Sequence, residues 1–222
     1  MISRSAKALF FQIASPIMRL NGAVYRRFRA PRNGLVKVHL GPGQAKYLNG
    51  WINVDANMFT AKCDVWSDFR GKLPFRDGTV DVIYSHHVIE HLPDQSLAFH
   101  FREVFRCLKP GGVFRIGGPS GDGAIEKFHQ GDSAWFSDFP DERSSLGGRF
   151  ANFVFCRGEH LTILTFSWLQ ELAHAAWFVD LSLCLPVTET HSGELITADV
   201  LEKEWESTPE CPHTLIVEGR KP

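Results

Sequence analysis

The sequence predicts an α/β fold, in which helices cover both faces of a mostly parallel sheet. Short apolar runs typical of buried strands alternate with segments of helical periodicity, and this alternation is characteristic of parallel sheets. The length of 222 residues suits one domain, and 44% hydrophobic with 22% charged residues are ordinary globular values. We expect a basic helical arm over residues 1–33 and a core domain over residues 34–222.

The arm is predicted to be an amphipathic helix. Its apolar residues recur every three or four positions on one helical face: Ile2, Ala6, Leu9, Ile13, Ile17, Leu20, Val24 and Phe28. Pro16 is expected to kink or divide the helix. Nine bases precede Asp55, the first acidic residue, and the remainder holds 15 bases against 25 acids. We expect the apolar face to dock on the chain's own core, with peripheral contact to an anionic membrane surface or a partner as the alternative.

The strands and helices of the core domain follow in order. The first strand ends in the turn Gly41-Pro42-Gly43 and the second ends at Asp55. Helical spacing of apolar residues predicts helices over 95–108 and 166–177, the first ending at the stop signal Lys109-Pro110-Gly111-Gly112. Strands are predicted over 35–40, 51–54, 63–66, 80–84, 113–116, 179–183 and 214–217.

Residues 117–160 interrupt this alternation. They are rich in Gly, Ser and Asp, which is typical of a loop, yet they carry seven Phe and Trp residues. A loop this long in a compact domain is usually functional, and its aromatic residues need a surface to pack on. We therefore predict a lid or substrate-binding insertion, with the aromatic residues serving packing rather than recognition.

Cysteine usage and hydropathy indicate the compartment. The five cysteines are scattered and form no C-x-x-C pair, so a disulfide framework or zinc ribbon is not expected. No stretch approaches the roughly 20 apolar residues of a membrane span, and no secretory signal is apparent. We expect a cytoplasmic protein, peripheral to a membrane if the arm contacts lipid.

Three stretches carry a resemblance to a known family. They are VKVHLGPGQAKYLNGWINVD at 36–55, LPFRDGTVDVIYSHHVIEHL at 73–92 and FRCLKPGGVFRIGGP at 105–119. Together they resemble the class I S-adenosylmethionine-dependent methyltransferases. The nearest likeness is to the small bacterial branch of the type-11 methyltransferases, whose members read LGxG…GWxNVD. The resemblance covers residues 35–120, and the final HTLIVEGRKP is similar to the family's last strand.

The resemblance implies a Rossmann-like three-layer sandwich with a seven-stranded, mostly parallel sheet and an antiparallel last strand. It implies S-adenosylmethionine as the cofactor, bound across the carboxyl ends of the strands, where the first and fourth strands meet. The positions that match the family's cofactor-binding residues are Gly41, Pro42, Gly43, Asp55, Asp68, Phe69, Ser85 and His86.

Each of these positions has a chemical reason. A Gly-x-Gly turn lets the backbone approach a ligand closely, and an acid that closes the second strand can accept both ribose hydroxyls, which assigns Asp55. By resemblance, Asp68 and Phe69 hold the adenine amino group, while Ser85 and His86 line the methionine end of the cofactor.

The chain departs from the family pattern in three places. The first-strand acid is replaced by His39, which weakens the expected contact to the cofactor's ammonium group, and the usual third glycine is Ala45. The interval from Gly43 to Asp55 leaves room for a crossover helix of only about one or two turns, at 3.6 residues per turn. A dinucleotide-binding motif would need glycine where Lys46 stands.

The histidine cluster at 86–91 has two interpretations. On a helix His87 and His91 would lie one turn apart, as would His86 and Glu90, which suits a general base or a metal ligand. Alternatively, Glu90 and His91 form structural hydrogen bonds at a helix start. The H-E-x-x-H order is absent, and we predict no metal. The candidate catalytic residues are His87, His91 and His160.

The predicted function is methyl transfer from S-adenosylmethionine to an unidentified acceptor, such as a hydroxyl of a small molecule or glycan. His39 and Ala45 favour the alternative, a non-catalytic binding or scaffold protein with the methyltransferase fold. A nucleic-acid substrate is not expected, because the body of the chain is acidic. The sequence leaves the oligomeric state open.

Overall fold

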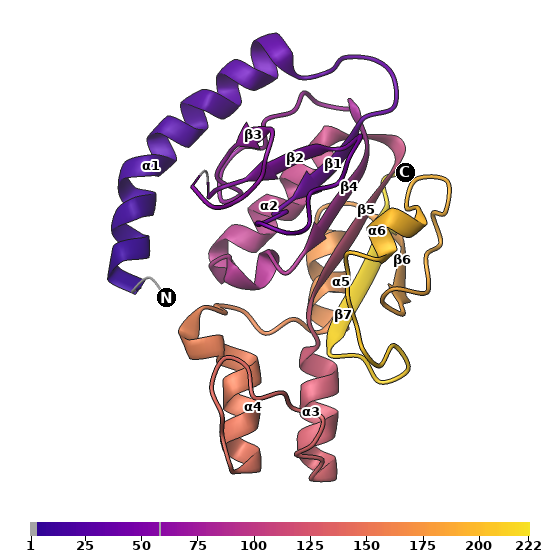
Figure 1. The fold of residues 1–222 in the computed structure, drawn as a ribbon. Helices are drawn as coiled ribbons and strands as arrows, with labels where there is room; N and C mark the ends of the chain where they lie inside the picture. Colours follow the sequence, from indigo (N-terminus) through magenta and orange to yellow (C-terminus); the bar gives the residue numbers. More distant parts are fainter. Residues whose placement is uncertain (1–3, 58) are drawn as a thin grey trace.

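The computed structural model describes residues 4–57 and 59–222, with side chains from Leu9 onward. Seven strands form one sheet: β1 (Lys37–Leu40), β2 (Ile52–Asp55), β3 (Val65–Trp66), β4 (Val80–His86), β5 (Leu108–Pro119), β6 (Val179–Cys184) and β7 (Thr214–Arg220). Their order is β3-β2-β1-β4-β5-β7-β6. Only β7 runs antiparallel to its neighbours within this described sheet, which confirms the predicted fold class (Figure 1).

One face of the sheet is covered by α2 (Asp94–Cys107) and α5 (Phe166–Ala175), which contact each other. Leu97, Phe101 and Val104 form the buried stripe of α2 that the spacing predicts. The helix ends at Cys107, and β5 already begins at Leu108. The predicted stop signal therefore lies within the long first part of β5.

The opposite face is covered by the chain between β6 and β7, which includes α6 (Ala198–Leu201). Ile196 and Val200 pack there against Trp51, Val82 and Tyr84. These contacts bury the second face of the sheet, as expected for a parallel sheet between two layers.

A buried ionic cluster holds this second layer to the sheet. Arg115 in β5 donates from Nε and Nη2 to Glu204 at 2.5 and 2.8 Å and from Nη1 to Glu218 at 2.6 Å. All three side chains are buried; burial alone would lower the pKa of Arg115, but the paired carboxylates outweigh it and raise the pKa. Glu204 also accepts the backbone N–H of Val187 at 2.8 Å, so the cluster anchors the loop after β6.

The arm forms α1 (Arg4–Val24), followed by a π-helical turn, η1 (Tyr25–Arg29). Pro16 lies inside α1 without dividing it, contrary to one of the two predicted effects. The helix lies beside β3 at the sheet edge (Figure 1). Its buried contacts to the core are made by Ala14, Met18 and Gly22.

The predicted apolar face of the arm points away from the core. Its described members are exposed, from 43% for Val24 to 74% for Phe28, with Leu9, Ile13, Ile17 and Leu20 between these values. Ile2 and the side chain of Ala6 lie outside the described part. The prediction that this face docks on the core is therefore wrong.

The other face of α1 docks through the fully buried Met18, through small residues and through polar side chains. The Ser15 hydroxyl donates to Asp68 Oδ2 at 2.6 Å, and Asn21 Nδ2 donates to the Trp66 carbonyl at 2.7 Å. Specific hydrogen bonds and close backbone approach decide the orientation of the helix, and hydrophobic periodicity does not report them.

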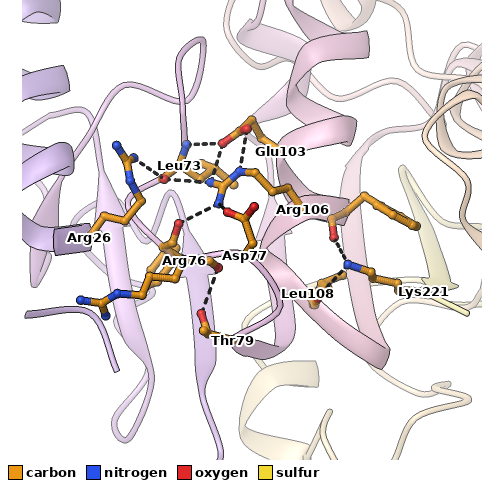
Figure 2. A network of polar contacts seen from close by, with 11 residues as sticks. Arg26, Leu73, Arg76, Asp77, Thr79, Glu103, Arg106, Leu108 and Lys221 are labelled. Carbon is orange, nitrogen blue, oxygen red and sulfur yellow. Dashed lines mark hydrogen bonds and ion pairs between the residues drawn. The ribbon is translucent and has the colours of Figure 1, made fainter. Parts of the chain in front are cut away.

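Figure 2 shows the polar network that joins the end of the arm to α2. Arg106 donates to both oxygens of Glu103 at 2.8 and 2.7 Å and to Asp77 Oδ1 at 2.6 Å. Glu103 also accepts the backbone N–H of Leu73 at 2.8 Å, and the Leu73 carbonyl accepts from Arg26 at 3.3 Å. The loop before β4 is thereby held between the arm and α2.

Residues 120–158 form a helical hairpin rather than the predicted loop. It contains α3 (Gly121–Gln130), α4 (Leu146–Phe155) and the short η3 (Cys156–Gly158), and it projects beyond the end of the sheet (Figure 1). Serines start both longer helices, because Ser120 and Ser145 accept backbone N–H groups of the first turn.

Several aromatic residues of the hairpin pack as predicted, whereas Phe139 and Phe155 are 71% and 54% exposed. Trp135 and Phe136 are buried with Ala124, and Phe150 and Phe153 pack against them to form a small separate core. The hairpin therefore has its own hydrophobic interior, distinct from the core around the sheet.

Candidate functional site

A cavity of about 670 Å³ lies at the carboxyl ends of β1, β2 and β4. This volume is within the roughly 300–1,000 Å³ of small-molecule sites. The position is the switch point of the sheet, where β1 has β2 on one side and β4 on the other. The walls come from Phe10 and Phe11 of α1, Gly41, Gly43, the segments 55–57, 68–70, 87–88 and 91–93, Phe59, Gly158, Glu159 and Leu161.

The two glycines of the turn after β1 have different surroundings. Both have positive φ, +76° for Gly41 and +54° for Gly43, which favours glycine. A Cβ on Gly41 would lie 2.2 Å from Val88 Cγ2, so this position is closed by packing. A Cβ on Gly43 would meet no heavy atom within 4 Å. Gly43 therefore presents bare backbone to open space, whereas Pro42 is buried and lines no part of the cavity.

No crossover helix follows this turn. Residues 44–51, all of them described, form turns and extended chain, so the expected helix of one or two turns is wrong. Lys46 instead extends from this stretch to His86, with 2.9 Å between Nζ and Nδ1. Burial lowers the pKa of Lys46.

Asp55 ends β2 at the cavity wall. Its Oδ2 accepts the Gly43 N–H at 3.1 Å and its Oδ1 accepts the Asn57 N–H at 2.8 Å. Burial raises the pKa of this carboxyl, and the backbone donors partly oppose that effect. A carboxylate has about four acceptor positions, so Asp55 can accept two further hydrogen bonds from a diol.

Asp68 and Phe69 also line the cavity, but the carboxylate of Asp68 is already engaged. Arg70 donates to both of its oxygens at 2.9 Å, and Ser15 donates to Oδ2. Burial alone would raise the pKa of Asp68, but these donors outweigh it and hold the pKa below its usual range. In this arrangement Asp68 ties α1 to the cavity wall.

Ser85, His86 and His39 are buried, and none of them lines the cavity. Burial lowers the pKa of His86 strongly and that of His39 to about 4, so both rings are neutral at physiological pH. His39 Nδ1 lies 3.2 Å from Asn53 Oδ1. The structure thus places the predicted methionine-end residues one layer behind the cavity wall.

His87 and Glu90 form a pair at one end of the cavity. His87 follows β4 in the left-handed region, with φ of 55°, and its side chain is 42% exposed on the cavity wall. Its Nδ1 lies 3.0 Å from Oε1 of Glu90, which is 1% exposed. Burial would raise the pKa of Glu90, but the hydrogen bond from His87 outweighs it and lowers the pKa.

His91 and His160 meet beside this pair. Their ring centroids are 5.2 Å apart, and His91 lines the cavity. His91 belongs to the 3-10 turn η2 (Ile89–His91), whereas His160 follows the hairpin. Burial lowers the pKa of His160. All three candidate catalytic histidines are therefore gathered at one end of the cavity.

Sequence reasoning missed the contribution of the arm to the site. Phe10 and Phe11 line the cavity, and the Arg70 guanidinium carbon lies 3.9 Å from the centroid of the Phe11 ring. These contacts join residues about sixty positions apart in the chain, and no local pattern signals them.

Comparison with known proteins shows that part of the chain is similar to methyltransferases. A family model described as "Methyltransferase domain" matches residues 28–116. A Mycolicibacterium smegmatis protein named "Probable S-adenosylmethionine-dependent methyltransferase" is 49% identical over 49 residues, which are 22% of this chain and 18% of that protein. The match thus spans about a fifth of the relative's length.

Two solved structures share the fold over nearly their whole length. A SAM-dependent methyltransferase from Archaeoglobus fulgidus aligns with a TM-score of 0.53 and 15% identity, covering 96% of this chain and 99% of that one. A SAM-dependent methyltransferase from Thermotoga maritima aligns with a TM-score of 0.50 and 14% identity, covering 99% and 96%.

The sheet order, the glycine turn after β1 and the acid at the end of β2 define the class I methyltransferase fold. The site fits the cofactor of that class, because Gly43 offers unobstructed backbone and Asp55 retains acceptor positions beside it. With the family match over residues 28–116, the chain resembles the class I S-adenosylmethionine-dependent methyltransferases, and S-adenosylmethionine is the cofactor that this resemblance implies.

Proposed function

We propose that this protein methylates a hydroxyl group of a small-molecule or glycan acceptor. One observation carries the proposal: a single cavity is lined by the Gly43–Asp55 pair and by His87, which the buried Glu90 holds from behind the wall. The first suits a ribose, and the second is a general base with its orienting carboxylate. The non-catalytic alternative predicts no such base on the cavity wall.

In this proposal, some residues bind the cofactor and others transfer the proton of the acceptor. Asp55 and the backbone at Gly43 hold the cofactor, which when bound supplies an activated methyl group whose transfer breaks its bond to sulfur. His87 takes the proton from the acceptor hydroxyl at Nε2, because its Nδ1 proton is held by Glu90. Glu90 stabilises the charged ring that results. The walls formed by Phe10 and Phe11 limit access of water.

Calorimetric titration with S-adenosylmethionine tests the cofactor site. Asp55→Ala should weaken binding about ten- to a hundredfold, because the ribose hydroxyls lose a partner worth about 1–3 kcal/mol. Glu171→Ala, an exposed acid on α5, is the control and should bind like the wild type. Unchanged affinity in a folded Asp55→Ala protein would remove Asp55 from the site.

Product formation tests the catalytic part. Hydroxyl-bearing small molecules and glycans are screened for acceptor-dependent release of S-adenosylhomocysteine. His87→Gln should retain cofactor affinity and lose about 10²–10⁴-fold in rate. Cofactor binding without acceptor-dependent product across the panel would favour the binding-protein alternative.

We also propose that α1 contacts an anionic membrane surface. Its exposed apolar residues form a continuous stripe on the side away from the core: Leu9, Ile13, Ile17, Leu20, Val24 and Phe28. A hollow of about 420 Å³ beside the helix is lined by Arg19, Arg26, Arg70 and Lys72. On the stripe itself, Arg27 lies over the Phe28 ring, and an apolar stripe together with bases complements acyl chains and anionic headgroups.

Co-sedimentation with anionic vesicles tests this contact. Ile13→Ser with Ile17→Ser should abolish it, while Trp205→Ser removes an equally exposed apolar side chain elsewhere and should not. High salt should weaken the binding, since each base near the surface contributes about 1 kcal/mol. Among the residues that the structure describes, no helix is long and apolar enough to cross a membrane. Equal sedimentation of both variants would refute the proposal.

A further inference from the structure

Three side chains at the histidine end of the cavity converge on one point. Glu90, His91 and His160 each offer one ligand atom, and these atoms all lie within 4.8 Å of one another. Two of the residues come from η2 and the third follows the hairpin, so the tertiary fold brings them together. The sequence separation of His91 and His160 explains why the spacing of residues 86–91 did not predict the cluster.

Both histidines are held in the tautomer that can bind a metal ion. His91 Nδ1 lies 2.9 Å from the Glu159 carbonyl, and His160 Nδ1 lies 3.1 Å from the Val154 carbonyl. A carbonyl oxygen only accepts, so each Nδ1 carries the proton and each Nε2 has its lone pair available. Orientation of a metal-binding imidazole by a backbone carbonyl is the usual outer-shell arrangement.

Glu90 contributes an incompletely satisfied carboxylate. The side chain is 1% exposed, and its Oε1 accepts from His87 Nδ1 at 3.0 Å. Its Oε2 has no hydrogen-bond partner among the described residues. A buried carboxylate oxygen without a partner is costly, and a bound cation would satisfy it. The same carboxylate also lies near the second ligand, with 3.9 Å between Oε1 and His91 Nε2.

We propose that Glu90, His91 and His160 bind a divalent first-row transition-metal ion. Two imidazoles and one carboxylate suit such ions, with ligand atoms about 2.0–2.2 Å from the metal. His91 and His160 need to turn inward by less than about 1 Å to reach that distance, and their side chains are not fully buried. Three protein ligands leave coordination positions open toward the cavity that His91 lines.

A metal ion at this site restricts the class of acceptor in the proposed methyl transfer. This inference about the acceptor rests on the proposed function. An acceptor hydroxyl on the ion becomes more acidic, because the metal stabilises the deprotonated oxygen. Its O–H bond breaks, the proton passes to His87 Nε2 and the oxygen keeps the electron pair. The acceptor is then an alcohol or phenol whose oxygen can coordinate a metal, which an amine-directed enzyme would not require.

Metal binding is tested on the full-length chain without a polyhistidine tag. Calorimetry with Zn²⁺ and visible spectroscopy with Co²⁺ should report one ion per chain. His160→Ala should weaken binding by at least a hundredfold, and Glu90→Gln should do the same where it folds. His174→Ala, which removes an exposed histidine on α5, should bind like the wild type. Absence of binding to the wild type, or equal binding by His160→Ala and His174→Ala, would overturn the site.

The proposed metal site and the proposed methyltransferase activity can be refuted independently of each other. Binding of S-adenosylmethionine is measured on the same proteins without metal, and His160→Ala should retain wild-type affinity because His160 does not line the cofactor end of the cavity. Retained cofactor binding with no metal binding refutes only the metal site. Metal binding without cofactor binding refutes the proposed function and leaves the ion site standing.

Discussion

Removal of the Arg115 guanidinium should be among the most destabilising single changes in this protein. Arg115→Met keeps much of the side-chain volume but leaves Glu204 and Glu218 buried without their cation. Breaking a buried pair by removing one partner costs about 3–5 kcal/mol, because the remaining charge is uncompensated. Against a total of about 5–15 kcal/mol for a typical domain, this loss is a large fraction of the stability.

The assay is urea denaturation of wild type and variant at neutral pH, followed by circular dichroism. The unpaired carboxylates should also acquire raised pKa values, so the folded variant binds more protons than its unfolded chain. Its stability should then increase as the pH is lowered, since the slope follows the difference in bound protons. Adding Glu204→Gln and Glu218→Gln should recover part of the loss.

A loss below about 1 kcal/mol would refute this reasoning, because it is the size expected of an exposed ion pair. A full loss that is insensitive to pH and is not recovered by the two glutamines would also contradict it. The damage would then come from packing around the Arg115 side chain and not from buried charge.

Further predictions concern the glycine turn and the buried His39. Gly43→Val should weaken S-adenosylmethionine binding, measured by calorimetry, far more than it lowers the melting temperature. Gly41→Val should chiefly lower the melting temperature, because the new side chain clashes with Val88. If the two variants lose affinity and melting temperature to the same extent, the different roles given to the two glycines are wrong. His39 has a pKa of about 4 when folded, against about 6.5 for an ordinary histidine. The unfolded chain therefore takes up this proton first, and stability falls as the pH drops from 6.5 toward 4, by about 3 kcal/mol at the lower end. His39→Phe should flatten that dependence in urea titrations, and an unchanged slope would show that His39 does not cause it.

The elements of the core domain could be predicted because their signals are local. Alternating short apolar runs and helical stripes gave the strands and the two long helices, and the chain matched them within a few residues. The hairpin could not be predicted in the same way, since its Gly, Ser and Asp content is typical of loops. Ser120 and Ser145 cap its helices, and they are a local signal that the prediction of a loop did not use.

The residues of the site could be predicted only where a functional residue directly follows the end of a strand. Gly43, Asp55, Phe69 and His87 lie on the cavity wall because parallel strands finish at the same edge of the sheet. The sequence does not indicate how deeply a side chain at a strand end is buried. Ser85 and His86 lie at the end of the same strand as His87, but they are buried behind the cavity wall. Asp68 differs again, because a hydroxyl from the distant arm engages its carboxylate.

The orientation of the arm illustrates a different limit. Periodicity identified its apolar stripe correctly, but a stripe specifies only that one face is apolar and not what covers it. Ser15 and Asn21 decide which face meets the core, through partners more than forty residues away. The exposed stripe is a result of that choice.

The separate interior of the hairpin has a consequence for how this protein can evolve. Most of the cavity wall belongs to residues 41–93, whereas Gly158, Glu159 and Leu161 reach it from the base of the hairpin. Substitutions in α3 and α4 act first on Trp135, Phe136 and their neighbours, and this cluster meets the rest of the chain at Cys211 and His213. Under the proposed function, changes in the hairpin therefore alter the acceptor side of the cavity first, while Gly43 and Asp55 keep their places at the strand ends.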